Sequence, residues 1–228
     1  MVIIVNKHAP EQVIKTLSKF GELVLFETHN IIYLQISNHP DIFFCTGNSQ
    51  LIAAPNTPEK FLSLLQKKGI NAIIGNKPVG TAYPESAIYN AVVTNRFLIH
   101  NLSVTDPVVL KTFSHLEHIN IPQGYGRCSL LPLKNNRFIT SDRGIANVLK
   151  QKGMEVLYVN PHGIILPGFN NGFFGGTAGV LNNQVLLAGS LNHYNEGEKV
   201  RTFLEQGGYK IIELYNGPLL DTGSILFV

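Results

Sequence analysis

Apolar residues along this chain occur in two kinds of segment that alternate from end to end. Short apolar runs, such as VIIVN at 2–6 and RFLIH at 96–100, have the length and the side chains of buried strands. Longer stretches, such as RGIANVLKQKG at 143–153, repeat apolar residues at the three- and four-residue spacing of an amphipathic helix. This alternation predicts an α/β fold.

Five helix starts are predicted, three of them at a proline, which suits the first helical position because its missing N–H needs no partner there. The predicted starts are Pro10, Pro58, Pro107, Arg143 and Glu196. Polar residues just before four of the helices are the expected N-caps: Thr57, Asp106, Asp142 and Asn195. Glycines follow four of the helices, as C-terminal caps do: Gly21, Gly69, Gly153 and Gly207 with Gly208.

Each helix lies within a repeated unit that reads strand, turn, strand, helix, strand. The turns are TGNS at 46–49, TN at 94–95, NN at 135–136 and NN at 182–183, and asparagine tolerates the positive φ of tight hairpins. The strands expected before these turns are DIFFC, AIYNAVV, CSLLPLK and TAGVL. The fifth unit is divided, because its first strand, SILFV at 224–228, ends the chain and its second, VIIVN, begins it.

A ring of five units explains this division. We therefore expect a five-bladed, pseudo-fivefold α/β propeller of ββαβ units, closed by pairing of the N- and C-terminal strands, in a single domain over residues 1–228. Pairing of the ends also removes exposed edge strands. The alternative is an ordinary doubly wound sheet, which explains neither the hairpin before each helix nor the apolar strands at both ends.

Composition narrows the choice of function. Apolar residues make up 44% of the chain, enough for a large core, and the +3 charge is scattered without a basic run, so no nucleic-acid partner is expected. No stretch is long and apolar enough to span a membrane, and Cys45 and Cys128 have no zinc-binding spacing. We expect a cytoplasmic protein with free thiols and with no cofactor or metal; the oligomeric state is not predicted.

The ββαβ repeat and the divided fifth unit resemble the pentein fold, also called the guanidino-group-modifying fold. Segments such as GYGRCSLL, GFFGGTAG and LLDTGSILF look most like a bacterial subset with this fold that is distant from the deiminases and amidinotransferases. The pentein families include arginine and agmatine deiminases, dimethylarginine dimethylaminohydrolases and glycine amidinotransferases. They also include a non-catalytic ribosome anti-association factor.

The resemblance implies a central cavity that binds a small guanidino compound and is lined by residues at the starts of the first strands. The candidate catalytic residues are Cys128, His39, Asp41 and Asp221. The candidate ligand-binding residues are Glu85, Asn90, Arg127, Thr177 and His193. Ser224 and the GFFGG run at 172–176 fall in the same region, and the glycines there would let backbone approach a ligand closely.

Two departures from the hydrolytic families leave the function open. Their nucleophilic cysteine lies in the last unit in a segment like GGNIHC, where this chain has DTGSILF, and their His-x-Asp falls where this chain has GGTAGVL. Cys128 lies in another unit, where it is either a nucleophile or a core thiol. The sequence favours a helix N-cap over a catalytic base as the role of Asp142. For Asp221, the structural alternative to a catalytic role is an Asx-turn. The structural alternative to a functional role is a loop cap for His39 and an ordinary loop position for His193. Two classes of function follow: a hydrolase or amidinotransferase acting on a guanidine or amidine, and a non-catalytic binding protein.

Overall fold

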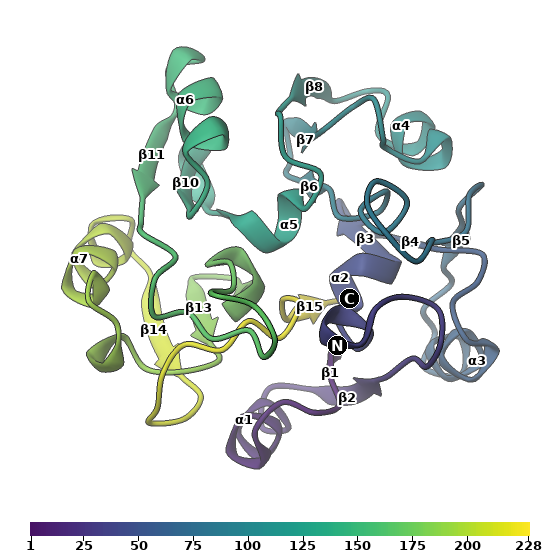
Figure 1. Ribbon diagram of the computed structural model, residues 1–228, viewed down its shortest axis with the longest axis horizontal. Coiled ribbons are helices and arrows are strands. Elements are labelled where there is room, and N and C mark those ends of the chain that lie inside the picture. Colours follow the sequence, from purple (N-terminus) through teal and green to yellow (C-terminus); the bar gives the residue numbers. More distant parts are fainter.

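The structure, a computed structural model that describes residues 1–228, contains five three-stranded sheets that follow one another around a central axis (Figure 1). In each sheet the first strand is antiparallel to the second, which is parallel to the third. One helix connects the second strand to the third in every sheet. The repeated strand, strand, helix, strand unit is therefore confirmed.

The elements of the first three units follow one another along the chain. Unit one contains β3 (Phe44–Gly47), β4 (Gln50–Ala53), α3 (Glu59–Lys67) and β5 (Ile73–Ile74). Unit two contains β6 (Val92–Val93), β7 (Phe97–His100), α4 (Pro107–Thr112) and β8 (Glu117–Asn120). Unit three contains β9 (Leu130–Pro132), β10 (Arg137–Thr140), α6 (Arg143–Gln151) and β11 (Glu155–Tyr158).

The last two units differ in how the chain reaches them. Unit four contains β12 (Ala178–Leu181), β13 (Gln184–Leu187), α7 (Gly197–Gln206) and β14 (Lys210–Glu213). Unit five is assembled from both ends of the chain: β15 (Leu226–Phe227), β1 (Val2–Asn6), α1 (Glu11–Leu17) and β2 (Glu22–Phe26). Strand β15 is antiparallel to β1, with Ile3 opposite Phe227 and Ile4 opposite Leu226. The predicted pairing of the terminal strands is confirmed.

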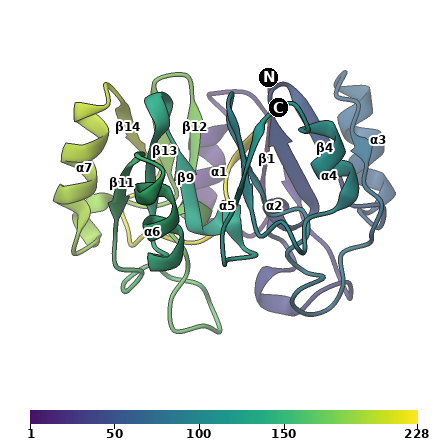
Figure 2. The same cartoon turned by 90° about the horizontal axis from the view of Figure 1, so that it is seen from above.

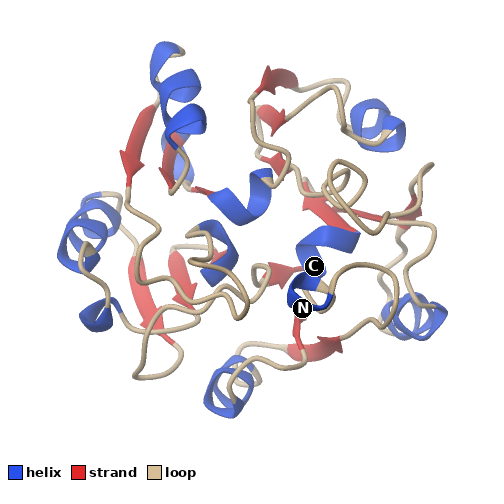
Figure 3. Ribbon diagram, viewed as in Figure 1, coloured by secondary structure: helices blue, strands red, loops and turns tan.

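The five connecting helices lie on the outside of the ring, and the sheets lie inside them (Figure 3). Each helix turns an apolar face inward; α6, for example, buries Ile145 and Leu149, and α7 buries Val200 and Leu204. A fully buried aliphatic side chain contributes about 1.5–3 kcal/mol, so these faces hold each helix against its own sheet. No helix is long and apolar enough to cross a membrane.

Helix capping follows the sequence at two of the four predicted positions. Asp106 accepts from the Val108 N–H and Asp142 from the Ile145 N–H, as N-caps do. The predictions for Thr57 and Asn195 are wrong, because Pro58 and Glu196 occupy the cap positions without a side-chain cap bond. Helices α3 and α7 each begin one residue later than predicted, so the expected cap residue lies one position too early.

In units one, three and four the first strand begins later than predicted, because a helical turn precedes it. These inner turns are α2 (Pro40–Phe43), α5 (Gly126–Ser129) and the 3-10 turn η3 (Gly175–Thr177). Helices α2 and α5 lie near the axis in Figure 1. The predicted strands DIFFC and CSLLPLK were therefore wrong at their first residues, which form turns that carry polar side chains to the centre. The predictions AIYNAVV and SILFV were also wrong at their first residues, since β6 begins only at Val92 and β15 only at Leu226.

The two ends of the axis are built differently. Both termini lie at one end of the ring, while the loop after β11 extends to the other (Figure 2). Tight hairpins join the first two strands of units one to four, and Asn48, Asn135 and Asn182 have the positive φ that such turns favour.

Candidate functional site

Polar side chains from four units meet at the centre of the ring. We call this group the central cluster, and its members are His39, Asp41, Asn90, Cys128, Asp221 and Ser224. All six are buried. They come from α2 and the residue before it, from α5, and from the segments before β6 and β15, so the packing of these units around the axis brings them together.

Cys128 is held on both sides by polar groups. Its thiol donates to Asp41 Oδ2 at 3.1 Å, and the Asn90 amide donates to Sγ at 3.3 Å. The same Asn90 side chain accepts from the Cys128 backbone N–H at 3.0 Å through Oδ1. Cys128 is therefore a positioned thiol, whereas a cysteine that only fills space in an apolar core has no such partners.

Asp41 has one oxygen with partners and one without. Oδ2 accepts from Cys128 and from the Ser224 hydroxyl at 2.5 Å, while Oδ1 is buried and has no hydrogen-bond partner. Ser224 has a φ of 68°, a left-handed conformation uncommon outside glycine, which carries its hydroxyl to Asp41. Burial raises the pKa of Asp41, and Asp221 raises it further, against the lowering effects of His39, Ser224 and Cys128.

His39 and Asp221 form a loosely spaced pair beside Asp41. His39 Nδ1 lies 3.8 Å from Asp221 Oδ1 and has no hydrogen-bond partner. Burial lowers the pKa of His39 to about 4, so its imidazole is neutral at neutral pH. Burial raises the pKa of Asp221 to about 6, although its carboxylate accepts from the Phe173 N–H at 2.8 Å and the Gly223 N–H at 3.0 Å.

The thiol of Cys128 is neutral in this environment. Burial and the nearby carboxyls of Asp41 and Asp221 raise its pKa well above the ordinary value. Arg127, the neighbouring cation, does not point at the thiol: its guanidinium donates to the carbonyls of Gly175 and Ala178 at 2.9 Å each. Arg127 also lines a separate cavity, formed by the hairpin turns and the terminal strands.

A cavity of about 330 Å³ opens onto one side of the central cluster. His39, Cys128 and Asp221 all line it. Its other walls are mostly apolar and aromatic: Tyr33, Ile36, Ile42, Tyr125, Leu166, Phe169 and Phe173, with Asn170 and Asn171. Such a cavity, apolar with a few converging polar groups, is typical of a small-molecule site.

The aromatic wall is itself fixed by hydrogen bonds. The hydroxyls of Tyr33 and Tyr125 lie 2.9 Å apart, and the Tyr125 hydroxyl lies 2.6 Å from Ser86 Oγ. The ring of Phe169 lies 6.1 Å from that of Tyr33 and is half exposed. Planar or cationic ligands pack well against such ring faces.

The structure does not bring every predicted residue to the cavity. Glu85 is exposed on the loop before β6, and His193 is exposed in a turn, where Nε2 contacts Asn216 Oδ1 at 2.9 Å. Neither lines the cavity, because both lie beyond the inner turns. Thr177 is buried, but its hydroxyl donates to the Phe174 carbonyl and is already used within its own turn.

The glycines of GFFGG do permit a close approach, but it is made by a side chain of the same protein. A Cβ at Gly176 would lie 2.0 Å from Asp221 Oδ1, and one at Gly172 would lie 2.5 Å from Asp221 Cβ. These two glycines therefore make room for the Asp221 carboxylate beside the cavity.

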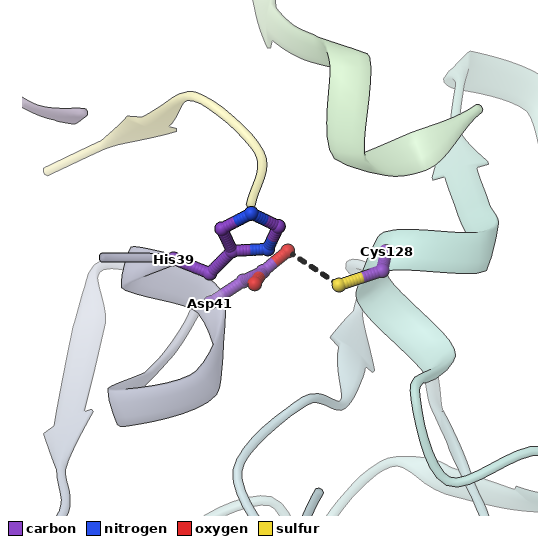
Figure 4. A group of neighbouring side chains, drawn as sticks. All are labelled: His39, Asp41 and Cys128. Carbon is purple, nitrogen blue, oxygen red and sulfur yellow. Dashed lines mark hydrogen bonds between the residues drawn. The ribbon is translucent and has the colours of Figure 1, made fainter. Parts of the chain in front are cut away.

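Three members of the cluster have ligand atoms suited to a metal. One atom from each of His39, Asp41 and Cys128 lies within 4.8 Å of the others, and Figure 4 shows the three side chains converging from α5 and the start of α2. The sequence placed all three among the catalytic candidates but did not indicate a metal site, because Cys128 lies far along the chain from His39 and Asp41 and only the fold brings them together.

The aromatic walls were also missed from the sequence. Tyr33, Phe169 and Phe173 lie in long connections between units, where no hydrophobic period sets the direction of a side chain. The available signal was composition: aromatic residues in polar, glycine-containing loops are more often binding residues than core residues.

Comparison of the structure with solved structures identifies the same architecture in several enzymes. SxtG, an amidinotransferase of the saxitoxin biosynthetic pathway from Microseira wollei, is 13% identical with a TM-score of 0.55, and the match covers 92% of this chain and 87% of that one. DDAH from Pseudomonas aeruginosa, in complex with citrulline, is 9% identical with a TM-score of 0.56, covering 93% and 91%. Agmatine deiminase from C. jejuni is 9% identical with a TM-score of 0.56, covering 92% and 86%.

These similarities establish the fold and do not by themselves assign an activity. The chain has the pentein fold, as its repeat pattern predicted. A search of curated protein sequences finds no significant match. At the level of sequence families, the match runs over residues 4–226, nearly the entire chain, and the protein belongs to the family of unknown function DUF6873.

Proposed function

We propose that this protein binds a guanidino or amidino small molecule in the central cavity and transforms it with Cys128 as the nucleophile. The observation that carries the proposal is that His39, Cys128 and Asp221 line one cavity, with Asp41 hydrogen-bonded to the thiol behind them. The proposal takes residues 1–228 as a single domain, because unit five is built from both ends of the chain.

The charges around the cavity favour a cation. Asp221 lines the cavity and Asp41 Oδ1 has no partner, whereas the neighbouring Arg127 is engaged by two carbonyls. A planar guanidinium or amidinium matches a carboxylate with two parallel hydrogen bonds. The faces of Tyr33 and Phe169 supply a surface for the same flat cation.

The proposed reaction is substitution at the central carbon of the ligand. Cys128 Sγ forms a bond to that carbon, and an amine leaves with the proton that His39 carries. Water then attacks the thioether-linked carbon, the S–C bond breaks, and the thiol takes back a proton. A guanidine and water thus yield a urea and an amine, while an amidine yields an amide and an amine.

Cation binding also answers how a neutral thiol becomes a nucleophile. The pKa of Cys128 is raised by burial and by two carboxyls, so little thiolate is present in the free protein. A cation bound beside Sγ favours the thiolate and lowers that pKa. His39 Nδ1, which has no other partner, is the acceptor for the released proton.

The test uses the full chain with arginine, agmatine and benzamidine as probes. Calorimetry measures binding, and product assays measure urea, amide and released amine. We expect Cys128→Ala to abolish turnover while binding survives, and Cys45→Ala, which removes a buried thiol outside the cavity, to leave both unchanged. Turnover that persists in Cys128→Ala, or the absence of binding by every probe, would refute the proposal.

A second candidate is a non-catalytic binding protein, as in the ribosome anti-association factor. It is favoured by the raised pKa of Cys128 and by the absence of the family nucleophile from the segment DTGSILF. In that case a probe binds equally well to the unmodified chain and to Cys128→Ala, and neither protein produces urea or amide.

A further inference from the structure

We propose that the central cluster is also a binding site for one Zn²⁺ ion, held by Cys128 Sγ, a ring nitrogen of His39 and a carboxylate oxygen of Asp41. These three side chains are all buried, and their ligand atoms lie within 4.8 Å of one another. They come from separate turns and converge on one point (Figure 4).

The strongest support is the pair of polar atoms that the protein leaves without partners. His39 Nδ1 and Asp41 Oδ1 are both buried and make no hydrogen bond. A buried polar group without a partner costs about 1–3 kcal/mol, so two of them in one cluster need a reason. A metal ion bound by the His39 ring and the Asp41 carboxylate gives both residues a further partner within the cluster.

The distances are close to those of a metal site. Tetrahedral zinc with bonds of about 2.0–2.3 Å places its ligand atoms about 3.5 Å apart. Cys128 Sγ and Asp41 Oδ2 already lie 3.1 Å apart, so this edge needs little change. The ligand atoms lie up to 4.8 Å apart, so the longest separation must shorten by about 1 Å. Rotation of a side chain can achieve this, and the cavity beside His39 gives room for it.

The donor set selects the metal. One sulfur, one nitrogen and one oxygen suit Zn²⁺, whereas Mg²⁺ and Ca²⁺ prefer oxygen ligands alone. Binding removes the thiol proton to solvent, and the charges of the thiolate and of Asp41 then balance the ion. The fourth coordination position of the ion faces the cavity. The carboxylate next to it is that of Asp221, whose Oδ1 lies 3.8 Å from His39 Nδ1.

The metal site is inferred from the central cluster alone. Only its consequence for catalysis rests on the proposed function. A zinc ion on Cys128 removes the nucleophile and adds positive charge where a guanidinium would bind. Zinc and a cationic ligand therefore exclude each other, which makes zinc an inhibitor of the proposed reaction.

The direct test is titration of the metal-free full chain with Co²⁺, whose bond to a thiolate gives a charge-transfer band in the near ultraviolet. We expect one Co²⁺ per chain, displacement by Zn²⁺, and release of about one proton per ion. Cys128→Ala should lose the band and bind Zn²⁺ more than about 100-fold more weakly. His39→Ala should also weaken Zn²⁺ binding, and Cys45→Ala should match the unmodified chain.

Urea unfolding of each variant without metal verifies that its fold is retained. The inference is overturned if the unmodified chain shows no Co²⁺–thiolate band, or if the band survives in Cys128→Ala. Zinc binding with no affinity for arginine, agmatine or benzamidine would refute the proposed function and leave the metal site standing. Binding of a probe without any Co²⁺ signal would refute the metal site and leave the proposed function standing.

Discussion

Two buried polar groups in this molecule use the same residue types in opposite ways. One, which we call the unit-two cluster, consists of Tyr89, His100, Thr105 and Asp106. Asp106 accepts from three backbone N–H groups, of Asn76, Lys77 and Val108, and from the Tyr89 hydroxyl. Both nitrogens of His100 have partners, Thr105 Oγ1 at 2.8 Å and the Gly124 carbonyl at 2.6 Å.

The central cluster is equally buried but incompletely bonded. His39 Nδ1 and Asp41 Oδ1 have no partners; His39 lines the cavity, and Asp41 lies next to His39 and Cys128. The pKa values do not separate the two histidines, since burial lowers the pKa of each to about 4. Hydrogen-bond completeness separates them. It indicates a structural role for the unit-two cluster, whereas the central cluster keeps two buried polar atoms without hydrogen-bond partners.

The largest expected contrast is between the two isosteric changes Asp106→Asn and Asp41→Asn. An amide at 106 turns an NH₂ toward backbone N–H donors, so we expect a loss of about 3 kcal/mol in unfolding free energy. An amide at 41 keeps the oxygen that Cys128 and Ser224 use and places NH₂ where Oδ1 has no partner, so the loss stays under about 1 kcal/mol. Urea unfolding at neutral pH measures both, and equal losses would erase the contrast.

The histidines give the next contrast. His100→Ala leaves the Gly124 carbonyl buried without a donor, and we expect a cost of about 3 kcal/mol. His39→Ala removes a ring that has no hydrogen-bond partner at Nδ1 and lines an existing cavity, so the cost is about 1 kcal/mol. Denaturant unfolding of the two variants side by side provides the comparison. A costlier His39→Ala would mean that His39 has a structural role.

The contributions of His100 and Asp221 to the slope of stability against pH have opposite signs. A histidine whose folded pKa is about 4 destabilises the fold as pH falls from 6.5 to 4, because the unfolded chain takes up the proton first. His100→Ala should therefore flatten the acid slope by up to about 1.4 kcal/mol per pH unit.

Asp221 acts in the opposite direction, because its folded pKa of about 6 lies above its ordinary 3.8 and the folded chain gains stability as pH falls through that range. Asp221→Asn should therefore steepen the acid slope by about 1 kcal/mol per pH unit. An unchanged slope would show that Asp221 does not titrate in this window.

The smallest expected effect is in the reactivity of the two thiols. Cys45 lies in β3 within the largest apolar cluster, and burial raises its pKa to about 12, whereas Cys128 lines the cavity. Iodoacetamide should modify Cys128 in the folded chain at least about tenfold faster than Cys45, with a rate that increases with pH. Peptide mass spectrometry reads out each site, and equal rates would mean that the cavity does not admit the reagent.

Much of the fold was accessible from the sequence, because each unit carries its own period, turn and cap. The caps Asp106 and Asp142 and the asparagine turns are local, and so they were predicted. The pairing of the ends was inferred from a missing hairpin turn. The start of the first strands was not predicted, because apolar residues in DIFFC fit a strand and a buried helical turn equally well.

The site was accessible only in part. His39, Asp41, Asn90, Cys128 and Asp221 were placed near the centre by applying the pentein resemblance to the repeat. Glu85 and His193 were misplaced, and the aromatic walls were missed, because loop paths depend on contacts that have no period along the chain. The unpaired atoms of His39 and Asp41 depend on side-chain geometry, which a spacing pattern does not contain.

The pairing of β15 with β1 sets an order of assembly during synthesis. The other four sheets form from neighbouring residues, and each can fold as it leaves the ribosome. The terminal sheet must wait for residues 226–227, and until then β1 has an unpaired edge. Asp221 and Ser224 arrive in the same last segment, so a nascent chain that lacks it carries Cys128 and His39 without a finished cavity. Any thiol chemistry that needs the finished cavity therefore waits until residues 221–227 have been added to the chain.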